Sequence, residues 1–126
     1  MKKNILVVDD DQTIISMFEF ILTQANYKPI TVNSGVICLE KLKAGLSVDL
    51  IFLDLKMPVL SGLDTFREIL KINSKIPVIM MTGDSIDSLL KEAFELGAYG
   101  IIYKPFDVEE VLMIIEKIFN VTKPIL

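Results

Sequence analysis

Six polar residues in this sequence stand at the ends of apolar segments, where their side chains could do chemistry together. They are three consecutive aspartates, a fourth aspartate, a threonine and a lysine: Asp9, Asp10, Asp11, Asp54, Thr82 and Lys104. Carboxylates gathered in a small space repel one another, and a divalent cation offsets that repulsion. Because oxygen ligands are available and no histidine is, Mg²⁺ or Mn²⁺ is the expected ion. A carboxylate nucleophile, a hard cation, an ammonium and a hydroxyl together form a set for phosphoryl transfer.

Each of these residues also has an ordinary structural explanation. An aspartate at the end of a strand commonly forms a turn or caps a helix. Lys104 before Pro105 could be a loop lysine, and Thr82 before Gly83 could cap the next helix. Each explanation is reasonable alone, but the coincidence of such residues at four segment ends favours a shared site.

Five short apolar segments, rich in Val and Ile, predict the strands that would position this site. They span residues 5–8, 29–32, 50–53, 77–81 and 100–103. Most of them lack polar alternation, which is typical of strands buried on both faces of a parallel sheet. The second segment is the weakest of the five and fits an edge strand.

Five longer stretches have apolar residues three and four positions apart, which predicts amphipathic helices. They span residues 12–25, 35–44, 62–72, 85–96 and 108–119. Ser34 and Asp107 are expected N-caps, and Glu110 completes a capping box with Asp107. Gly45 and Gly97 are expected helix ends.

The order of strand and helix, repeated five times, predicts a single α/β domain over residues 1–126. Right-handed crossovers would make it a doubly wound, five-stranded parallel sheet, (βα)5. In such folds the chemistry lies beyond the carboxyl ends of the strands, which is where the six polar residues fall.

Composition excludes several classes of function. The chain has 126 residues and a net charge of −4, so it lacks the excess of basic residues that nucleic-acid binding requires. It has no histidine, so serine–histidine catalysis, histidine-ligated zinc and phosphohistidine on this chain are excluded. A single cysteine, Cys38, excludes an internal disulfide and suggests a reducing compartment. No apolar run approaches a membrane span or a signal peptide, so we expect a cytoplasmic protein.

Four motifs resemble those of the receiver domains of two-component response regulators, and the resemblance covers essentially the whole chain. The motifs are a first strand with its acidic pair, Ile-Leu-Val-Val-Asp-Asp (5–10); a phosphorylation segment, Asp54-Leu-Lys-Met-Pro with Gly62; a fourth strand with a hydroxyl, Val78-Ile-Met-Met-Thr82-Gly; and a fifth-strand signature, Gly97-Ala98 followed by Lys104-Pro105-Phe106. Each is modestly specific alone, and all four in this order are highly specific. The chain is most similar in this respect to single-domain regulators of the chemotaxis and sporulation type.

The resemblance implies a flavodoxin-like strand order, 2-1-3-4-5, and a set of site roles. Asp54 would accept the phosphoryl group. Asp9, Asp10 and Asp54 would hold Mg²⁺, together with the backbone carbonyl of Lys56. The donor would be a phosphohistidine of a histidine kinase or of a histidine phosphotransfer protein. The chain would catalyse its own phosphorylation and dephosphorylation, without being an enzyme that acts on other substrates.

The resemblance also implies how the phosphorylated state would be sensed. Thr82 would bond a phosphoryl oxygen, and Lys104 would pair with the same group after a salt bridge to Asp54 in the resting state. Pro105 is expected to follow a cis peptide bond that aims the lysine inward. The signal would be a changed affinity for a downstream protein, in a monomer or a phosphorylation-dependent dimer, with no contact to nucleic acid or membrane.

Some residues depart from the family pattern or add to it. Ile101 stands where many members carry Tyr or Phe, which leaves open whether a switch operates without that aromatic ring. Lys56 and Asp84 flank the path of the attacking water in the family, and they either tune the phosphoryl lifetime or are simply solvated. Met113 and Ile114 could form with Ile101 an exposed patch for dimerisation or target docking, or belong to a more fully buried helix.

Two further apolar groups lie close to the expected site in the sequence. Ile14, Ile15 and Phe18 follow the acidic residues, and one or two of them could face a kinase helix while most would be core. Val59 and Leu60 make the loop after the expected phosphorylation segment unusually apolar.

Three other classes of function explain parts of the sequence. A phosphatase of the haloacid dehalogenase type would use Asp9-x-Asp11-x-Thr13, but its later acidic motif should follow Lys104 and here precedes it. A flavin-binding domain of flavodoxin type needs a glycine- and hydroxyl-rich loop where three aspartates would repel the phosphate. A phosphorylation-independent interaction module on the same scaffold would usually lack an acidic residue, the acceptor or the lysine, and all of them are present.

Overall fold

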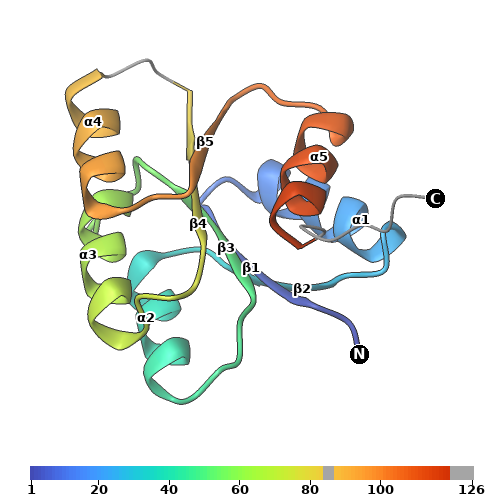
Figure 1. Ribbon diagram of the computed structural model, residues 1–126, viewed down its shortest axis with the longest axis horizontal. Coiled ribbons are helices and arrows are strands. Elements are labelled where there is room, and N and C mark those ends of the chain that lie inside the picture. Colours follow the sequence, from blue (N-terminus) through green and yellow to red (C-terminus); the bar gives the residue numbers. More distant parts are fainter. Residues whose placement is uncertain (84–86, 120–126) are drawn as a thin grey trace.

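Five strands and five helices alternate along the chain in the computed structural model, which describes residues 1–83 and 87–119 (Figure 1). In order they are β1 (Asn4–Val8), α1 (Gln12–Gln24), β2 (Lys28–Val32), α2 (Gly35–Lys43), β3 (Leu50–Asp54), α3 (Gly62–Ile72), β4 (Val78–Thr82), α4 (Asp87–Leu96), β5 (Gly100–Tyr103) and α5 (Val108–Phe119). Every predicted strand and helix is confirmed, with ends that agree or differ by one residue. The predicted start of the fourth helix, at residue 85, lies outside the described residues.

The five strands form one parallel sheet in the order β2-β1-β3-β4-β5, which confirms the order 2-1-3-4-5. The weak second strand is indeed an edge strand. The register pairs Val8 with Leu53 on β3, and Asp54 with Met81 on β4. The carboxyl ends of β1, β3 and β4 are therefore level, so that residues which end these strands meet at one edge of the sheet.

Helices cover both faces of the sheet, α1 and α5 on one side and α2, α3 and α4 on the other (Figure 1). Successive side chains of a strand point to opposite faces. On β1, Leu6 and Val8 belong to one hydrophobic cluster and Ile5 and Val7 to the other. Because both faces are buried, the strands need apolar residues at every position, which explains the unbroken apolar segments of the sequence.

The expected signals at the helix ends are present. The Ser34 hydroxyl accepts a hydrogen bond from the first turn of α2. Before α5, the Asp107 carboxylate accepts from the Glu110 N–H at 2.9 Å, and the Glu110 carboxylate accepts from the Asp107 N–H at 3.4 Å, as in a capping box. Gly45 and Gly97 have φ values of 98° and 105°, in the left-handed region that favours glycine after a helix.

Gly62, the first residue of α3, packs directly on the backbone at the end of β3. A Cβ atom at this position would lie 2.0 Å from the Asp54 carbonyl oxygen and 2.6 Å from the Leu55 Cα atom. The Gly62 N–H also donates to the Leu55 carbonyl oxygen at 2.9 Å. The lack of a side chain at Gly62 is therefore what lets α3 begin against Asp54.

Replacing Gly62 with alanine tests this packing. Because the added methyl group meets backbone atoms that cannot turn away, we expect Gly62→Ala to lower the free energy of unfolding by roughly 2–3 kcal/mol in urea titrations. Gly83→Ala is the matched control, since a Cβ atom at Gly83 has open space around it. The control should change stability by less than about 0.5 kcal/mol. Equal effects of the two substitutions would contradict the packing argument.

Candidate functional site

Three carboxylates meet at the carboxyl edge of the sheet. Asp9 follows β1 and is fully buried, Asp54 ends β3 and is 6% exposed, and Asp10 is exposed. One carboxylate oxygen from each lies within 4.8 Å of the others. The level ends of the neighbouring strands β1 and β3 thus bring together the acidic residues that the sequence singled out.

Lys104 reaches this cluster from the end of β5. Its Nζ atom lies 2.9 Å from Asp9 Oδ2 and 3.4 Å from Asp54 Oδ1. The expected ion pair with Asp54 is present, and the shorter contact, with Asp9, was not foreseen. The peptide bond between Lys104 and Pro105 is cis, as predicted. The Lys104 N–H donates to the Thr82 carbonyl oxygen at 2.8 Å, which fixes the lysine backbone to the end of β4.

Thr82 is the last residue of β4 and only 2% exposed. It follows Met81, which is paired with Asp54 in the sheet register. The predicted hydroxyl therefore lies on the strand next to Asp54, at the same edge. Asp84, the other residue expected near this end of β4, lies outside the described residues.

Burial and charge shift the protonation of the site. Burial, followed by the charge of Asp9, raises the pKa of Asp54 to about 6, although Lys104 and a backbone hydrogen bond from Lys56 oppose the shift. Burial alone would lower the pKa of Lys104, but the carboxylates of Asp9 and Asp54 outweigh it and raise that pKa. At neutral pH the site therefore holds an ionised Asp54, ready as a nucleophile, beside a charged ammonium.

The site has an unmet need for positive charge, which is the test of whether a divalent cation fits it. Asp9 Oδ1 accepts a hydrogen bond from the Asp11 N–H at 2.9 Å. Asp9 Oδ2 is buried and pairs with Lys104 Nζ at 2.9 Å, and the same ammonium lies 3.4 Å from Asp54 Oδ1. One ammonium shared by two buried carboxylates leaves negative charge that a divalent cation would offset. The donor set, oxygen alone, fits Mg²⁺ or Mn²⁺.

Asp11 has a structural role. Its carboxylate accepts a hydrogen bond from the Thr13 N–H at 2.9 Å and caps α1, and it is not part of the carboxylate cluster. The ordinary explanation of a strand-end aspartate is thus right for Asp11. In α1, Ile15 and Phe18 are core residues, and Ile14 is the one of the three that remains partly exposed.

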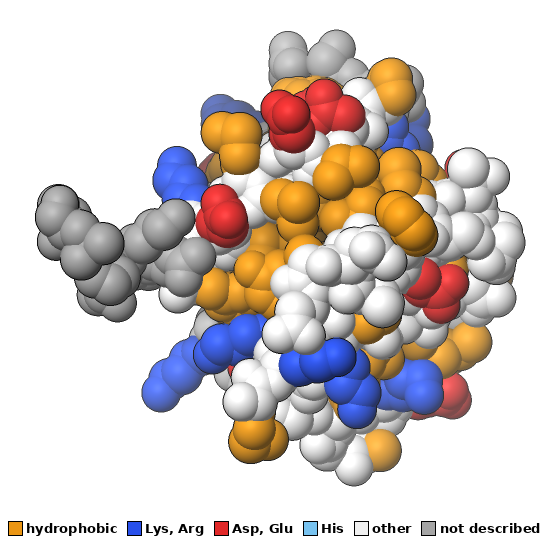
Figure 2. All heavy atoms as spheres, turned by 90° about the vertical axis from the view of Figure 1, so that its right-hand side faces the viewer, with side chains coloured by type: hydrophobic (Ala, Val, Ile, Leu, Met, Phe, Trp, Pro, Cys, Tyr) orange, Lys and Arg blue, Asp and Glu red, His pale blue; other side chains and the backbone are white. Residues whose placement is uncertain are grey.

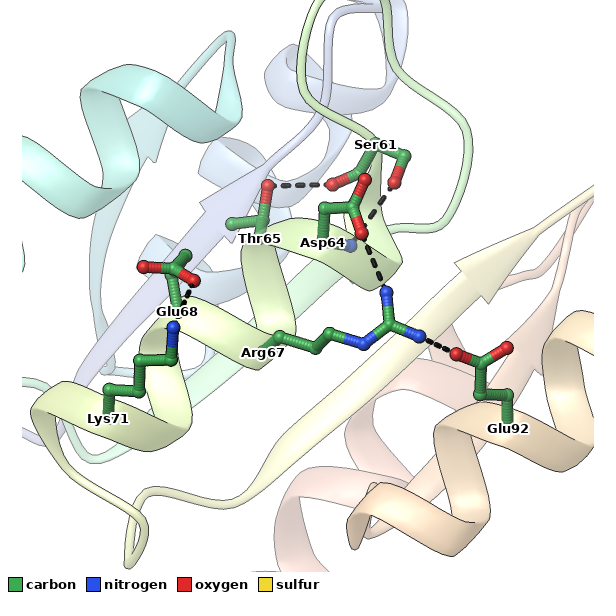
Figure 3. Close-up of polar contacts among 7 residues, drawn as sticks. All are labelled: Ser61, Asp64, Thr65, Arg67, Glu68, Lys71 and Glu92. Atoms are coloured by element: carbon green, nitrogen blue, oxygen red, sulfur yellow. Dashed lines mark hydrogen bonds and ion pairs between the residues drawn. The ribbon is translucent and has the colours of Figure 1, made fainter.

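A hollow of about 580 Å³ extends from the loop after Asp54 to α4. Arg67, the only arginine of the sequence, borders it and pairs with Asp64 on its own helix at 2.6 Å and with Glu92 on α4 (Figure 3). The Ser61 hydroxyl caps the helix by accepting from the Asp64 N–H at 3.1 Å. None of these residues is among the site residues expected from the sequence. The lone arginine was the one available signal, since its forked guanidinium suits two carboxylates.

The three residues of the expected partner patch lie together. Ile101, Met113 and Ile114 line one hollow of about 250 Å³ between β5 and α5. Met113 is 68% exposed, whereas Ile101 and Ile114 are half-buried and pack against the core. The juxtaposition is confirmed, but most of the exposed apolar surface in this group comes from Met113.

The face over α1 and α5 carries an apolar area. Figure 2 shows hydrophobic side chains gathered across its middle, with Asp and Glu residues beside them and a row of Lys residues below.

No helix among residues 1–83 and 87–119 is long and apolar enough to cross a membrane.

The fold and the site together define an α/β domain with a buried acidic cluster at the carboxyl edge of its sheet. The family model of the response regulator receiver domain matches residues 5–116. The chain belongs to this family of two-component signalling domains. The match excludes the flavin-binding and phosphatase alternatives, the second of which also required Asp11 in the site.

Among curated relatives, the chain is 37% identical over 118 residues to the transcriptional regulatory protein CpxR homolog of Haemophilus influenzae. It is 34% identical over 113 residues to the alkaline phosphatase synthesis transcriptional regulatory protein PhoP of Bacillus subtilis. The alignments cover 92% and 88% of this chain, but 50% and 46% of those proteins. The chain therefore spans about half the length of these relatives.

Solved structures share the fold closely. The chemotaxis protein CheY4 of Vibrio cholerae superposes with a TM-score of 0.88 at 26% identity, over 94% of this chain and 100% of that one. A CheY-like receiver domain protein of Methanospirillum hungatei has a TM-score of 0.89 at 26% identity, over 93% of each chain.

The raised pKa of Asp54 predicts a pH dependence of stability. Because the metal-free folded chain keeps a proton on Asp54 up to about pH 6, while the ordinary value is 3.8, folding takes up a proton between these values. The contribution of Asp54 to the free energy of unfolding is fully present below its pKa in the unfolded chain. It is lost as the pH rises through its pKa in the folded chain. Asp54→Asn cannot titrate, so we expect its stability relative to the wild type to rise by about 1–3 kcal/mol between about pH 4 and pH 7.

Urea unfolding of both proteins in the presence of a chelator measures this difference. The same comparison in excess Mg²⁺ is the control, because a cation at the carboxylates would stabilise the wild type and shrink the advantage of Asp54→Asn. A difference that stays flat across the pH range would show that burial does not perturb Asp54.

Proposed function

We propose that this chain is a phosphorylation-dependent switch. It accepts a phosphoryl group on Asp54 from a phosphohistidine of a histidine kinase or a histidine phosphotransfer protein. The observation that carries the proposal is the buried cluster in which Lys104 lies within 3.4 Å of both Asp9 and Asp54. Membership of the receiver family supports the same conclusion.

The proposed reaction begins with the Asp54 carboxylate as nucleophile. One of its oxygens attacks the phosphorus, the bond between phosphorus and the donor imidazole breaks, and an aspartyl phosphate forms. Asp54 is suited to this step because it is ionised at neutral pH and held at the rigid end of β3. Lys104 offsets negative charge that the phosphoryl oxygens bring to the carboxylates.

A divalent cation at the site would neutralise the phosphoryl oxygens and so lower the barrier to transfer in both directions. Asp9, Asp10 and Asp54 would hold it, with the backbone carbonyl of Lys56 as a fourth ligand. The buried carboxylates of Asp9 and Asp54, which share the ammonium of Lys104, support this assignment. The receiver domain of sensor histidine kinase PA1611 of Pseudomonas aeruginosa, which has the same fold, is described with magnesium coordinated in its active-site cleft.

After transfer, Thr82 would donate a hydrogen bond to a phosphoryl oxygen, and Lys104 would keep an ion pair with the same group. The chain would catalyse its own phosphorylation and dephosphorylation, and it would act on no separate substrate. Lys56 and Asp84 would tune the lifetime of the phosphoryl group through the approach of water.

The output would be a changed affinity for a downstream protein in the cytoplasm. The hollow lined by Ile101, Met113 and Ile114 is the proposed partner face, for a target or a second copy of the chain. A phosphorylation-independent module is the alternative function. The complete set of acidic residues, acceptor and lysine at one site argues against that alternative.

We expect the chain to take up a single phosphoryl group. Intact mass spectrometry after incubation with Mg²⁺ and acetyl phosphate should show one adduct on the wild type, because Asp54 is the buried nucleophile of the site. Asp54→Ala and a chelator should each abolish the adduct.

Other outcomes separate the alternatives. An adduct that survives Asp54→Ala would place the acceptor elsewhere. No adduct on a wild type whose circular dichroism shows an intact fold would make the phosphorylation-independent module the better account.

Lys104→Ala should separate cation affinity from reaction rate. The ammonium is the positive charge beside Asp9, so its loss should tighten Mg²⁺ binding in calorimetry by roughly tenfold. Its loss also removes charge compensation in the transition state, so the adduct should form about 100-fold more slowly. If affinity and rate fell together, the lysine would be holding the site in shape and would not be competing with the cation.

A further inference from the structure

The loop between β3 and α3 carries an unusual residue at its tip. Val59 has a φ value of 70°, in the left-handed region. The Leu60 N–H donates to the Pro58 carbonyl oxygen at 2.8 Å, which closes a γ-turn around Val59. The other described non-glycine residue with positive φ is Asn26, a type that tolerates this region, whereas a β-branched residue there is a true outlier.

The Val59 side chain contributes no packing to the hydrophobic core. It is 98% exposed and belongs to neither hydrophobic cluster. Its neighbours Met57 and Leu60, in contrast, pack against the core. The loop is thus anchored on both sides of a strained, apolar tip. A strained residue with no contacts inside the molecule points to a function outside it.

The position of the tip is fixed relative to the phosphoacceptor. The hydrogen bond from the Gly62 N–H to the Leu55 carbonyl oxygen closes the loop at its base, directly after Asp54. Gly62 is three positions after Val59, so the two Cα atoms are no more than about 11 Å apart. Any protein that brings a histidine to Asp54 must approach the sheet edge at the base of this loop, next to its tip.

We propose that Val59 is a contact residue for the protein phosphodonor, and that it determines which phosphohistidine proteins transfer to Asp54. This inference rests on the proposed function. The donor is the favoured partner because its histidine must touch Asp54, whereas a downstream target has no need to cover this edge. The apolar tip would pack on the donor surface beside the histidine.

Two substitutions at Val59 separate the contact from the strain. Val59→Asn relieves the backbone strain and removes the apolar surface, while Val59→Ile keeps both. Phe94→Gln is the matched control, since it removes an exposed apolar side chain on α4. Each variant is compared with the wild type in thermal unfolding and in phosphorylation by two donors. The donors are acetyl phosphate and the ATP-phosphorylated core of the histidine kinase that transfers fastest to the wild type.

We expect Val59→Asn to unfold at a higher temperature than the wild type, because its strain is relieved. We also expect its kcat/KM with the kinase to fall roughly tenfold, as for the loss of one buried valine contact. Its rate with acetyl phosphate should stay within about twofold of the wild type. Val59→Ile and Phe94→Gln should match the wild type with both donors.

The remaining outcomes overturn the inference in distinguishable ways. An unchanged kinase rate for Val59→Asn would show that the tip does not touch the donor. An equal loss with both donors would show that the turn shapes the site and makes no contact. An acetyl phosphate adduct on the wild type without transfer from any kinase would refute the donor class. No adduct from either donor would refute the proposed function itself.

Discussion

The structure depends on the crowding of three carboxylates against one ammonium at the edge of a rigid sheet. Asp9 and Asp54 are both nearly or fully buried, and their mutual repulsion is not relieved by water. Lys104 lies 2.9 Å from one and 3.4 Å from the other, and it compensates only part of the charge. The strands cannot move apart to relax this tension, because each is hydrogen-bonded to its neighbours and packed on both faces. The site therefore has excess negative charge that a bound cation would neutralise.

The helices and loops around the edge hold this arrangement at short range. Gly62 lets α3 start against the backbone of Asp54, so the first turn of the helix packs directly on the residue that carries the proposed nucleophile. The hydrogen bond from the Lys104 N–H to Thr82 ties β5 to β4 at the level of the site. Neither contact could lengthen by an ångström without moving a charged group. Backbone contacts thus hold in place the segments that carry Asp54 and Lys104.

Much of this was predictable because buried parallel strands and amphipathic helices leave distinct patterns. The apolar segments located the strands, and the polar residues that end them located Asp9, Asp54, Thr82 and Lys104. Spacing could not reveal that Lys104 lies nearer to Asp9 than to Asp54, because both carboxylates are within reach of the same side chain. It could not assign Asp11 to the helix cap, since three consecutive aspartates look alike in a sequence. The left-handed backbone at Val59 was hidden because valine is not a residue that signals it.

The tie between α3 and α4 bears on how a phosphoryl group on Asp54 could be transmitted. Arg67 links the two helices through Glu92, and both side chains are about two-fifths exposed. An exposed pair of this kind contributes about 0–1 kcal/mol, while moving a two-state equilibrium from 1:99 to 99:1 takes about 5.5 kcal/mol. The ion pair can therefore bias the position of α4 but cannot lock it. Any strong coupling must come from the buried end, where a doubly charged group on Asp54 would draw Lys104 away from Asp9 and engage Thr82 at the end of β4. Electrostatic interactions are strongest where water is excluded, so a switch of the proposed kind would originate at the sheet edge and end at the helix surface.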